Sequence, residues 1–455
     1  MNFSDTIAAI STAHSPGGIG IVRISGEKAR QIADAVFKSK KGTVARLLGY
    51  TALYGGVYDG EEKIDEAVAL MFASPKSYTG EDVVELSCHG GTAVMKRVLR
   101  AVMAAGARQA LPGEFTRRAF ENGKVTLTEA EAVMALVSAA GMQAERVASA
   151  AKGGALYRRI SNIKDELTDI TAWLAAWSDF PEEDIPDVEP EALTKRLGMV
   201  GENIKELIDG FDTGRIQREG IKTVIAGRPN VGKSTLMNLI TGHESSIITD
   251  IPGTTRDVVS EQVTLFDVPL ILSDTAGLRS SCDTVEQIGV RRAREMLEGA
   301  QLIIAVFDSS KELTHEDIKL LEYCSGRSCV AVINKSDLEN KLSKEAVERY
   351  IKHTVTFSAK NADSADELGR EIVKAVNLRE LDPDMGILFN ERQLDCAKRA
   401  YSELENAISA TKNGVTLDAV TVMCESSLDA LLELSGERIT DAVADAVFSH
   451  FCVGK

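Results

Sequence analysis

The sequence predicts a multidomain protein built from α/β and helical parts. Between about residues 219 and 380, strand-like and helix-like segments alternate, which is typical of a mainly parallel sheet with helices on both faces. Residues 1 to about 120 mix both kinds of segment and predict a compact α+β domain. The stretches from about 125 to 216 and from about 388 onward have the 3.6-residue apolar spacing of helices. A length of 455 residues allows about three domains.

Composition limits the classes of protein to consider. With 44% hydrophobic residues the chain can form sizeable cores. The formal net charge of −16 argues against a bulk electrostatic grip on nucleic acid, so an RNA contact would need a local basic patch or a partner. Seven cysteines without a Cys-x-x-Cys pair predict reduced thiols. The start lacks the basic region of a signal peptide and no run of about 18 apolar residues occurs, so we expect a cytoplasmic protein without a membrane partner.

The N-terminal α+β domain is predicted from short β-branched runs and two amphipathic stretches. Its expected strands are 6–10, 20–24, 67–72 and 83–86, and its expected helices are 28–37 and 91–105. Farther along, residues 128–131 have the capping residue and early acids of a helix start. The acidic stretch 179–186 interrupts the helices. A solvated loop explains its acids better than a metal site does.

Residues 227–234 read Gly-Arg-Pro-Asn-Val-Gly-Lys-Ser and fit the phosphate-loop pattern of Gly, four residues and Gly-Lys-Ser. The pattern needs a strand before it and a helix after it, which residues 221–226 and 234–240 supply. Glycines let backbone N–H groups close around phosphate oxygens, and the helix N-terminus adds partial positive charge. Lys233 would reach the β- and γ-phosphates, and the Ser234 hydroxyl would ligate Mg²⁺. Further buried strands of a parallel sheet are expected at 270–272, 302–307, 329–333 and 354–357.

Four more motifs follow in the order found in GTP-binding proteins. Residues 253–257 would place a Thr hydroxyl on Mg²⁺, and 274–277 would bring an acid and a Gly N–H to the metal and γ-phosphate. In 334–337, the Asp337 carboxylate can accept two hydrogen bonds that guanine offers and adenine does not. Residues 358–360 would support the base. The expected GTP contacts are Asn230, Val231, Gly232, Lys233, Ser234, Thr235, Thr249, Asp250, Ile251, Pro252, Gly253, Thr254, Thr255, Asp274, Thr275, Ala276, Gly277, Asn334, Lys335, Ser336, Asp337, Ser358, Ala359 and Lys360, with Mg²⁺ on Ser234 and Thr255.

The group that promotes hydrolysis is less evident. In Ras-like enzymes a Gln soon after the Gly of the third motif orients the attacking water. Here Leu278 follows Gly277, so another group must position the water. The nearest downstream acids are Asp283 and Glu286, and spacing alone makes Glu286 an ordinary acid at a helix start.

The chain resembles the MnmE (TrmE) family, the GTPases of wobble-uridine tRNA modification, over essentially its full length. The resemblance is carried by residues 5–7, 17–26, 78–82 (Tyr-Thr-Gly-Glu-Asp), 112–115 (Pro-Gly-Glu-Phe) and 179–184, by the GTP motifs, and by 451–455 (Phe-Cys-Val-Gly-Lys). It implies an N-terminal α+β folate-binding and dimerisation domain at 1–119. It further implies a Ras-like P-loop GTPase domain at 217–380, inserted in a helical domain formed by 120–216 plus 381–455.

The resemblance also implies a catalytic role for potassium. In that family the GTPase domains pair across their nucleotide faces in a K⁺-dependent way, and hydrolysis drives their pairing and opening. By motif match, K⁺ would bind the Asn230 side chain and the backbone carbonyls of Thr249, Ile251 and Thr254. A cation there can neutralise transition-state charge as an arginine finger does. The resemblance reassigns Glu286 as the acid that orients water through a bridging water, with Asn230 and Lys233 completing the catalytic set.

For the N-terminal domain the resemblance implies a folate site. The matching positions are Arg23, Glu85, Lys124 and Lys455, which would bind 5-formyltetrahydrofolate or methylene-tetrahydrofolate. Glu85 can pair with pterin N–H groups, and cationic side chains suit the folate carboxylates. Without the resemblance, Arg23 and Lys124 are simply surface charges. Cys452 matches the cysteine of the terminal motif, and its role stays open.

The family acts as a homodimer with an FAD-containing partner, MnmG (GidA), in a heterotetramer or larger complex with tRNA as substrate. Together they would add an aminomethyl or carboxymethylaminomethyl group at C5 of the wobble uridine. Two alternatives stay open at this point. One is an Era-like ribosome-assembly GTPase, which shares the five GTP motifs, and the other is a GTP-gated scaffold that scarcely hydrolyses GTP.

Overall fold

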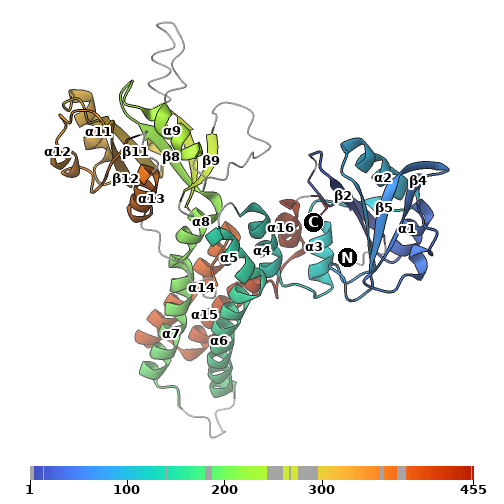
Figure 1. Ribbon diagram of the computed structural model, residues 1–455. Helices are drawn as coiled ribbons and strands as arrows, with labels where there is room; N and C mark the ends of the chain where they lie inside the picture. Colours follow the sequence, from blue (N-terminus) through green and yellow to red (C-terminus); the bar gives the residue numbers. More distant parts are fainter. Residues whose placement is uncertain are drawn as a thin grey trace, which may run out of the picture. The chain divides into compact units, whose positions relative to one another are not determined.

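The computed structural model describes residues 5–13, 15–139, 142–179, 187–242, 260–265, 268–274, 296–358, 363–376, 386–451 and 453–454. The chain divides into two compact units. Figure 1 labels their helices and strands. Unit 1 comprises Met1–Met134, Lys152–Gly201 and Cys396–Lys455, and unit 2 comprises Ala135–Ala151 and Glu202–Asp395. Each unit therefore collects segments that lie far apart in the sequence.

The N-terminal part of unit 1 is an α+β domain. Its sheet has the strand order β3-β4-β5-β6-β2-β1-β7, with neighbours antiparallel except β1 and β7. The strands are β1 (Ile7–Ile10), β2 (Ile19–Ser25), β3 (Phe37–Lys38), β4 (Thr51–Asp59), β5 (Glu62–Phe72), β6 (Val83–His89) and β7 (Arg108–Gln109). Helices α1 (Ala29–Val36) and α2 (Thr92–Ala104) bury their apolar stripes on one face, against residues such as Ile24, Met71 and Leu86. The four predicted strands and two predicted helices are confirmed.

Strand β4 was not predicted, and its two central glycines explain why. Gly55 and Gly56 interrupt the β-branched and aromatic pattern by which strands are recognised. In the structure a Cβ atom on Gly55 would lie 2.3 Å from the carbonyl oxygen of Lys38 in β3. Glycine at position 55 therefore allows the short edge strand β3 to approach β4. The same glycine weakens the sequence pattern by which β4 would have been predicted.

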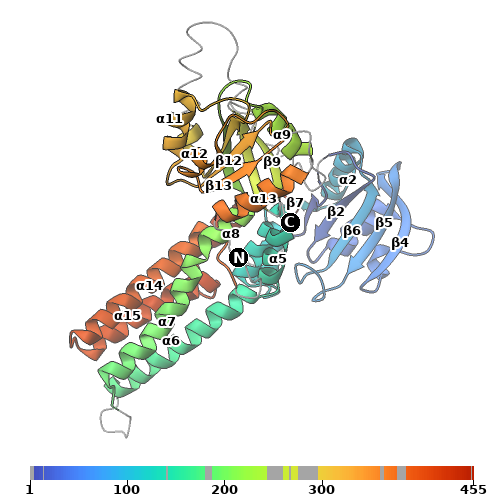
Figure 2. The ribbon, with the colours of Figure 1, turned by 60° about the vertical axis from the view of Figure 1, so that its left-hand side comes forward.

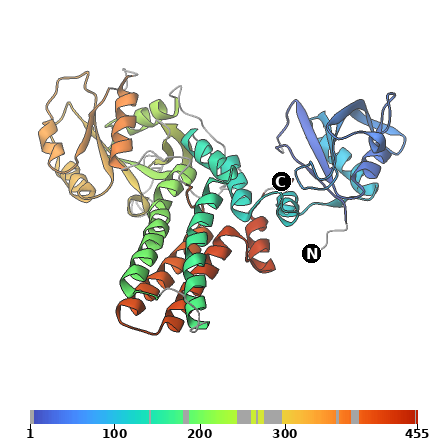
Figure 3. The same cartoon turned by 90° about the horizontal axis from the view of Figure 1, so that it is seen from below.

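The helical part of the chain lies mainly in unit 1 and draws on both ends of the sequence, and its helices that begin at Leu127, Pro190 and Glu391 cross the boundary with unit 2. The helices are α3 (Glu114–Glu121), α4 (Leu127–Ser138), α6 (Ala155–Asp179), α7 (Pro190–Asp209), α14 (Glu391–Lys412), α15 (Leu417–Ser435) and α16 (Asp441–Ser449). Helices α6, α7, α14 and α15 lie side by side as a bundle (Figures 2 and 3). Ser427 of α15 donates to the carbonyl oxygen of Ala400 in α14 at 2.8 Å. The predicted helical part, formed from segments before and after the α/β region, is confirmed.

Unit 2 contains the α/β domain. Among its described residues six strands have the order β13-β12-β11-β8-β10-β9, with neighbours parallel except β9 and β10. The strands are β8 (Ile221–Ala226), β9 (Ser260–Leu265), β10 (Val268–Asp274), β11 (Leu302–Asp308), β12 (Cys329–Asn334) and β13 (His353–Thr356). The helices are α5 (Met142–Lys152), α8 (Phe211–Glu219), α9 (Lys233–Gly242), α11 (His315–Cys324), α12 (Lys344–Glu348) and α13 (Asp363–Ala375). The mainly parallel sheet and its predicted buried strands are confirmed.

Alternating side chains of the parallel strands divide the core of this domain into two layers. Leu302, Ile304 and Val306 pack with α9 and α13 on one face of the sheet. Ile303 and Phe307 pack with α11 and α12 on the other. Because both faces are covered, every residue of β11 is buried. The exact domain boundaries proposed from the sequence stay a prediction. In the described part of the chain, none of the helices combines the length and the apolar character that a membrane crossing requires.

Candidate nucleotide site

The phosphate loop connects β8 to α9, as its motif predicted. Gly227, Asn230 and Gly232 have positive φ angles of 151°, 64° and 103°. A Cβ on Gly227 would lie 2.4 Å from the carbonyl oxygen of Val306, and one on Gly232 would lie 2.1 Å from Nδ2 of Asn334. Both glycines are therefore required by backbone conformation and by close approach. The loop leads into the N-terminus of α9, where backbone N–H groups and the helix dipole favour an anion.

Lys233 is the first residue of α9 and curls back over the loop. Its Nζ donates hydrogen bonds of 2.8 Å to the carbonyl oxygens of Gly227 and Arg228. These bonds fix the loop around its own cation, which places the charge where the motif predicts phosphate oxygens. Ser234 and Thr235 follow in the first turn of α9.

The base-recognition motif at the end of β12 is bonded directly to the phosphate loop. Asn334 is buried, and its Nδ2 donates to the carbonyl oxygen of Val231 at 2.8 Å. Its Oδ1 accepts from the backbone N–H of Lys335 at 2.7 Å. The Asn side chain thus satisfies a backbone group in each of two loops, and its donor role explains why an apolar residue could not replace it.

Lys335 makes the second link between these loops. Its backbone is left-handed, with φ of 63°, and its Nζ donates to the carbonyl oxygen of Asn230 at 2.8 Å and to Oδ2 of Asp308 at 2.7 Å. Burial alone would raise the pKa of Asp308, but the hydrogen bonds from Lys335 and Ser310 outweigh it and hold that pKa below its usual value. Asp308 is therefore ionised at neutral pH.

The last two described residues of the predicted base pocket also meet. The Ser358 hydroxyl lies 3.2 Å from Oδ1 of Asp337 and donates to it. The N–H of Ser336 donates to the carbonyl oxygen of Phe357 at 3.1 Å. These residues follow the adjacent strands β12 and β13, so Asp337, the acid predicted to select guanine, lies at the carboxyl edge of the sheet, where ligands of open α/β sheets bind.

Several predicted residues lie outside the described residues. They are Thr249, Asp250, Ile251, Pro252, Gly253, Thr254, Thr255, Thr275, Ala276, Gly277, Glu286, Ala359, Lys360, Cys452 and Lys455, and for Asp274 the structure describes the backbone at the end of β10. Three of the four K⁺ ligands and one Mg²⁺ ligand lie outside the described ranges, and the K⁺ and Mg²⁺ ligands and the water-orienting acid all stay predictions. So does the acidic stretch after α6, of which residues 180–186 are outside the described ranges.

A second candidate site lies in the N-terminal α+β domain. A cavity of about 280 Å³ is lined by Arg23, Phe72, Tyr78, Val83, Glu85 and Val133. Arg23 and Glu85 face each other on β2 and β6, and Arg23 Nε donates to Glu85 Oε1 at 2.9 Å. Two of the four predicted folate contacts thus lie together in one cavity. Lys124 does not line it and donates instead to the carbonyl oxygen of Pro75 at 3.0 Å.

Aromatic rings around Arg23 were not singled out from the sequence. The guanidinium of Arg23 lies 5.5 Å from the ring centroid of Tyr78 and 5.6 Å from that of Phe115. Both residues belong to the motifs that carry the family resemblance, which was the signal available. Contacts of this kind orient the cation, and Arg23 Nη1 also donates to the carbonyl oxygen of Gly454 at 3.5 Å.

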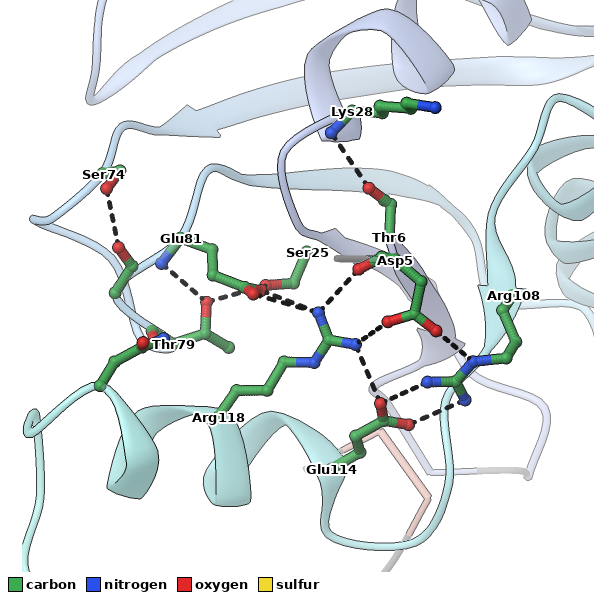
Figure 4. A network of polar contacts seen from close by, with 12 residues as sticks. Asp5, Thr6, Ser25, Lys28, Ser74, Thr79, Glu81, Arg108, Glu114 and Arg118 are labelled. Carbon is green, nitrogen blue, oxygen red and sulfur yellow. Dashed lines mark hydrogen bonds and ion pairs between the residues drawn. The ribbon is translucent and has the colours of Figure 1, made fainter. Parts of the chain in front are cut away.

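An ionic cluster around the buried Arg118 was also missed by sequence analysis (Figure 4). Arg118 of α3 is 0% exposed at its side chain. Its Nη1 donates to Oε1 of Glu81 at 3.1 Å, and its Nη2 donates to Oδ1 of Asp5 at 2.7 Å and Oε1 of Glu114 at 3.0 Å. Arg108 donates to the same Asp5 and Glu114 carboxylates. The cluster therefore joins α3 to the Tyr78–Asp82 motif and to Asp5, which precedes β1.

Comparisons with known proteins cover the whole chain. Residues 6–124 match the family model described as GTP-binding protein TrmE N-terminus, and residues 127–452 match the MnmE helical domain. The tRNA modification GTPase MnmE of Clostridioides difficile (strain 630) is 39% identical over 459 residues, covering 100% of both chains. The protein of the same name from Alkaliphilus metalliredigens (strain QYMF) is 40% identical over 461 residues, again covering 100% of both. The solved G domain of the T. maritima FeoB iron transporter is 25% identical, covers 34% of this chain and 98% of that one, and has a TM-score of 0.26, so the assignment rests on the full-length relatives. The chain belongs to the MnmE family of tRNA modification GTPases.

Proposed function

We propose that this chain is a K⁺-dependent GTPase that modifies C5 of the wobble uridine of certain tRNAs together with an FAD-containing partner of the MnmG (GidA) type. The observation that carries the GTPase part is the bonding of the phosphate loop to the guanine-recognition motif through Asn334 and Lys335. Full-length relatives decide against the Era-like alternative. The name of these relatives, tRNA modification GTPase, also favours hydrolysis over the GTP-gated scaffold.

The K⁺ requirement is supported by the conformation of Asn230. Its left-handed backbone is held by the bond from Lys335 to its own carbonyl oxygen. This conformation is uncommon for a residue other than Gly and favours Asn among the side chains that adopt it. Asn230 would thereby present its side-chain oxygen to a cation beside the phosphates, with Thr249, Ile251 and Thr254 completing the coordination and Glu286 orienting the water.

Steady-state hydrolysis tests this part of the proposal. We expect multiple-turnover phosphate release from GTP in KCl, little in NaCl at equal ionic strength, and none from ATP. Asn230→Ala should abolish the K⁺ stimulation, whereas Asn238→Ala, an exposed Asn on α9, should keep it. Equal and slow rates in both salts would remove the K⁺ assignment and favour the scaffold.

The cavity of the N-terminal domain is proposed to bind a reduced folate. Its residues fit such a ligand, because Phe72, Tyr78 and Val133 offer apolar and aromatic surface for a flat ring, Glu85 accepts from N–H donors, and Arg23 suits an anionic group. The folate would supply the one-carbon unit, and this chain would bind and orient it. Calorimetric titration with 5-formyltetrahydrofolate should show binding that Glu85→Gln weakens at least tenfold while Glu62→Gln, an exposed acid on β5, leaves it unchanged.

Homodimerisation is supported by the outer face of the N-terminal sheet. Ile19, Tyr54 and Val68 are 68%, 61% and 41% exposed on the face opposite α1 and α2. A second copy would cover these apolar side chains. Light scattering is expected to give twice the chain mass of 49.0 kDa, and mixing with the MnmG partner should give a heterotetramer or larger assembly.

Because the chain carries a net charge of −16, the partner is expected to supply most of the tRNA contact, in the cytoplasm. Tight, salt-sensitive binding of tRNA by the chain alone would contradict this division.

A further inference from the structure

We propose that Asp308 is a positioning residue for the guanine nucleotide. It holds Lys335 against the phosphate loop, so that the loop that binds phosphate and the turn that binds the base are fastened into one unit. The inference rests on the GTP-binding function proposed above and adds a residue outside the five GTP motifs. Asp308 lies at the end of β11, and it acts on the nucleotide through Lys335.

The surroundings of Asp308 show that its carboxylate is committed to this contact. The residue is 3% exposed, and its Oδ2 accepts from Lys335 Nζ at 2.7 Å. Its Oδ1 accepts from the hydroxyl and the N–H of Ser310 at 2.7 and 3.1 Å. A buried carboxylate is costly unless it is paired and hydrogen-bonded, and here both oxygens are engaged. Among the described residues, the cation that this carboxylate pairs with is the Lys335 ammonium, which it therefore orients.

Ser309 binds the backbone of the turn that contains Lys335. Its hydroxyl donates to the carbonyl oxygen of Lys335 at 2.8 Å, and its N–H donates to the carbonyl oxygen of Asn334 at 2.9 Å. The consecutive residues Asp308 and Ser309 thus fix both the side chain and the main chain of Lys335. Lys335 is left-handed at φ of 63°, a conformation that surrounding contacts must stabilise in a residue of this type.

The other end of the Lys335 side chain explains how this affects the ligand. The same ammonium that is bonded to Asp308 donates to the carbonyl oxygen of Asn230, at the left-handed position of the phosphate loop. A bound nucleotide touches both loops, so its release is slow when the two loops cannot separate. Weakening the Asp308–Lys335 bond frees the ammonium from one of its two partners and loosens the phosphate loop at Asn230. We therefore expect Asp308 to set the residence time of the nucleotide.

The test is the release rate of mant-GDP from the full chain, measured by stopped flow with excess unlabelled GDP. Hydrogen bonds to charged groups are about twice as strong as neutral ones, so Asp308→Asn is expected to accelerate release about five- to tenfold. Asp317→Asn is the matched control. Asp317 is 2% exposed and pairs with Arg228 of the phosphate loop at 2.8 Å, but it makes no bond to Lys335. It should change release by less than about twofold, although both variants lose a buried charge and are expected to lower the melting temperature similarly.

A double-mutant cycle shows whether Asp308 acts through Lys335. Asp308→Asn should add little to the release rate of Lys335→Met, whereas additive effects would contradict the inference. If Asp308→Asn does not fold, Ser309→Ala removes another contact that fixes Lys335 and should accelerate release about two- to fivefold. Equal effects of the Asp308 and Asp317 variants would overturn the positioning role. A wild-type chain that binds no mant-GDP would instead overturn the GTP-binding function. A wild-type chain that binds mant-GDP but shows no K⁺-stimulated turnover would overturn the K⁺ mechanism, and the comparison of the Asp308 and Asp317 variants would remain valid.

Discussion

Replacement of Arg118 by Met tests whether the ionic cluster around this residue stabilises the N-terminal domain. The guanidinium is 0% exposed and bonds three carboxylates, on Asp5, Glu81 and Glu114. Methionine keeps much of the apolar length of the side chain but removes the charge. Because Asp5 and Glu114 retain Arg108, the carboxylate left without its cation is that of Glu81.

The expected loss of stability follows from this one carboxylate that loses its cation. Removing one partner of a buried ion pair costs about 3–5 kcal/mol, because the other charge is left uncompensated. Glu81 is 18% exposed at its side chain and still accepts from the Ser25 hydroxyl at 2.6 Å, so water and this hydroxyl relieve part of the cost. We therefore expect a loss of about 3 kcal/mol, near the lower end of that range.

Hydrogen exchange followed by mass spectrometry measures this loss within the domain. A loss of about 3 kcal/mol corresponds to exchange about 150-fold faster in peptides from β1, β6 and α3, since about 1.4 kcal/mol is a factor of ten. The control is Arg97→Met, which breaks an exposed pair with Glu62 and should cost less than about 1 kcal/mol. A loss in Arg118→Met no larger than that of the control would refute the assigned role of the cluster.

The same cluster predicts a dependence on pH. The hydrogen bond from Arg108 is the largest cause that lowers the pKa of Asp5. For Glu114, burial raises the pKa, but the bonds from Arg108, the Leu111 N–H and Arg118 outweigh it, so that this pKa is also lowered. Since both folded-state pKa values lie below the unfolded ones, their stabilisation is complete above about pH 4.5 and is lost as the pH falls through the folded values. Arg118→Met should reduce this acid dependence.

Two further predictions concern packing and thiol chemistry. Gly113→Ala should speed exchange in the 441–451 segment about tenfold or more, because a Cβ there would lie 2.5 Å from the carbonyl oxygen of Phe448. Gly123→Ala has the same φ of 67° and open space around it, so a similar result for both would mean that backbone strain and not packing is responsible. Burial raises the pKa of the Cys88 and Cys424 thiols to about 12, so neither should react with iodoacetamide in the native protein at pH 8, as mass spectrometry would show.

Sequence analysis succeeded where the chemistry is contiguous. The run before the phosphate loop was predicted as a strand at 221–226, and β8 has the same bounds. Asn334 and Asp337 were assigned from one short motif after a buried strand, because a carboxylate there can accept two hydrogen bonds that guanine offers, and this role stays a prediction. The residues that contact this motif in the structure could not be predicted in the same way. Asp308 was not assigned to any motif, because its partner Lys335 lies 27 positions away.

The N-terminal domain shows the same limit. Arg118 was not predicted to be buried, because an arginine in a short helix is by default a surface residue. Its acids come from Asp5 and Glu81, which are 113 and 37 positions away, and their convergence is a property of the fold. The family resemblance proposed Arg23, Glu85 and Lys124 as folate contacts. In the structure the first two line one cavity and Lys124 donates to the carbonyl oxygen of Pro75, so the folate contacts stay a prediction.

The bundle of α6 and α15 has a consequence for synthesis of the chain. Ser178 and Asp418, 240 positions apart, are joined by a hydrogen bond of 2.6 Å. At about 5–20 residues per second, a ribosome needs on the order of ten to fifty seconds to deliver the second helix after the first. During that time the apolar stripe of α6, which includes Ile160 and Leu167, has no α15 to pack against. The nascent chain should therefore bind holdase chaperones after α6 emerges and release them once α15 is made.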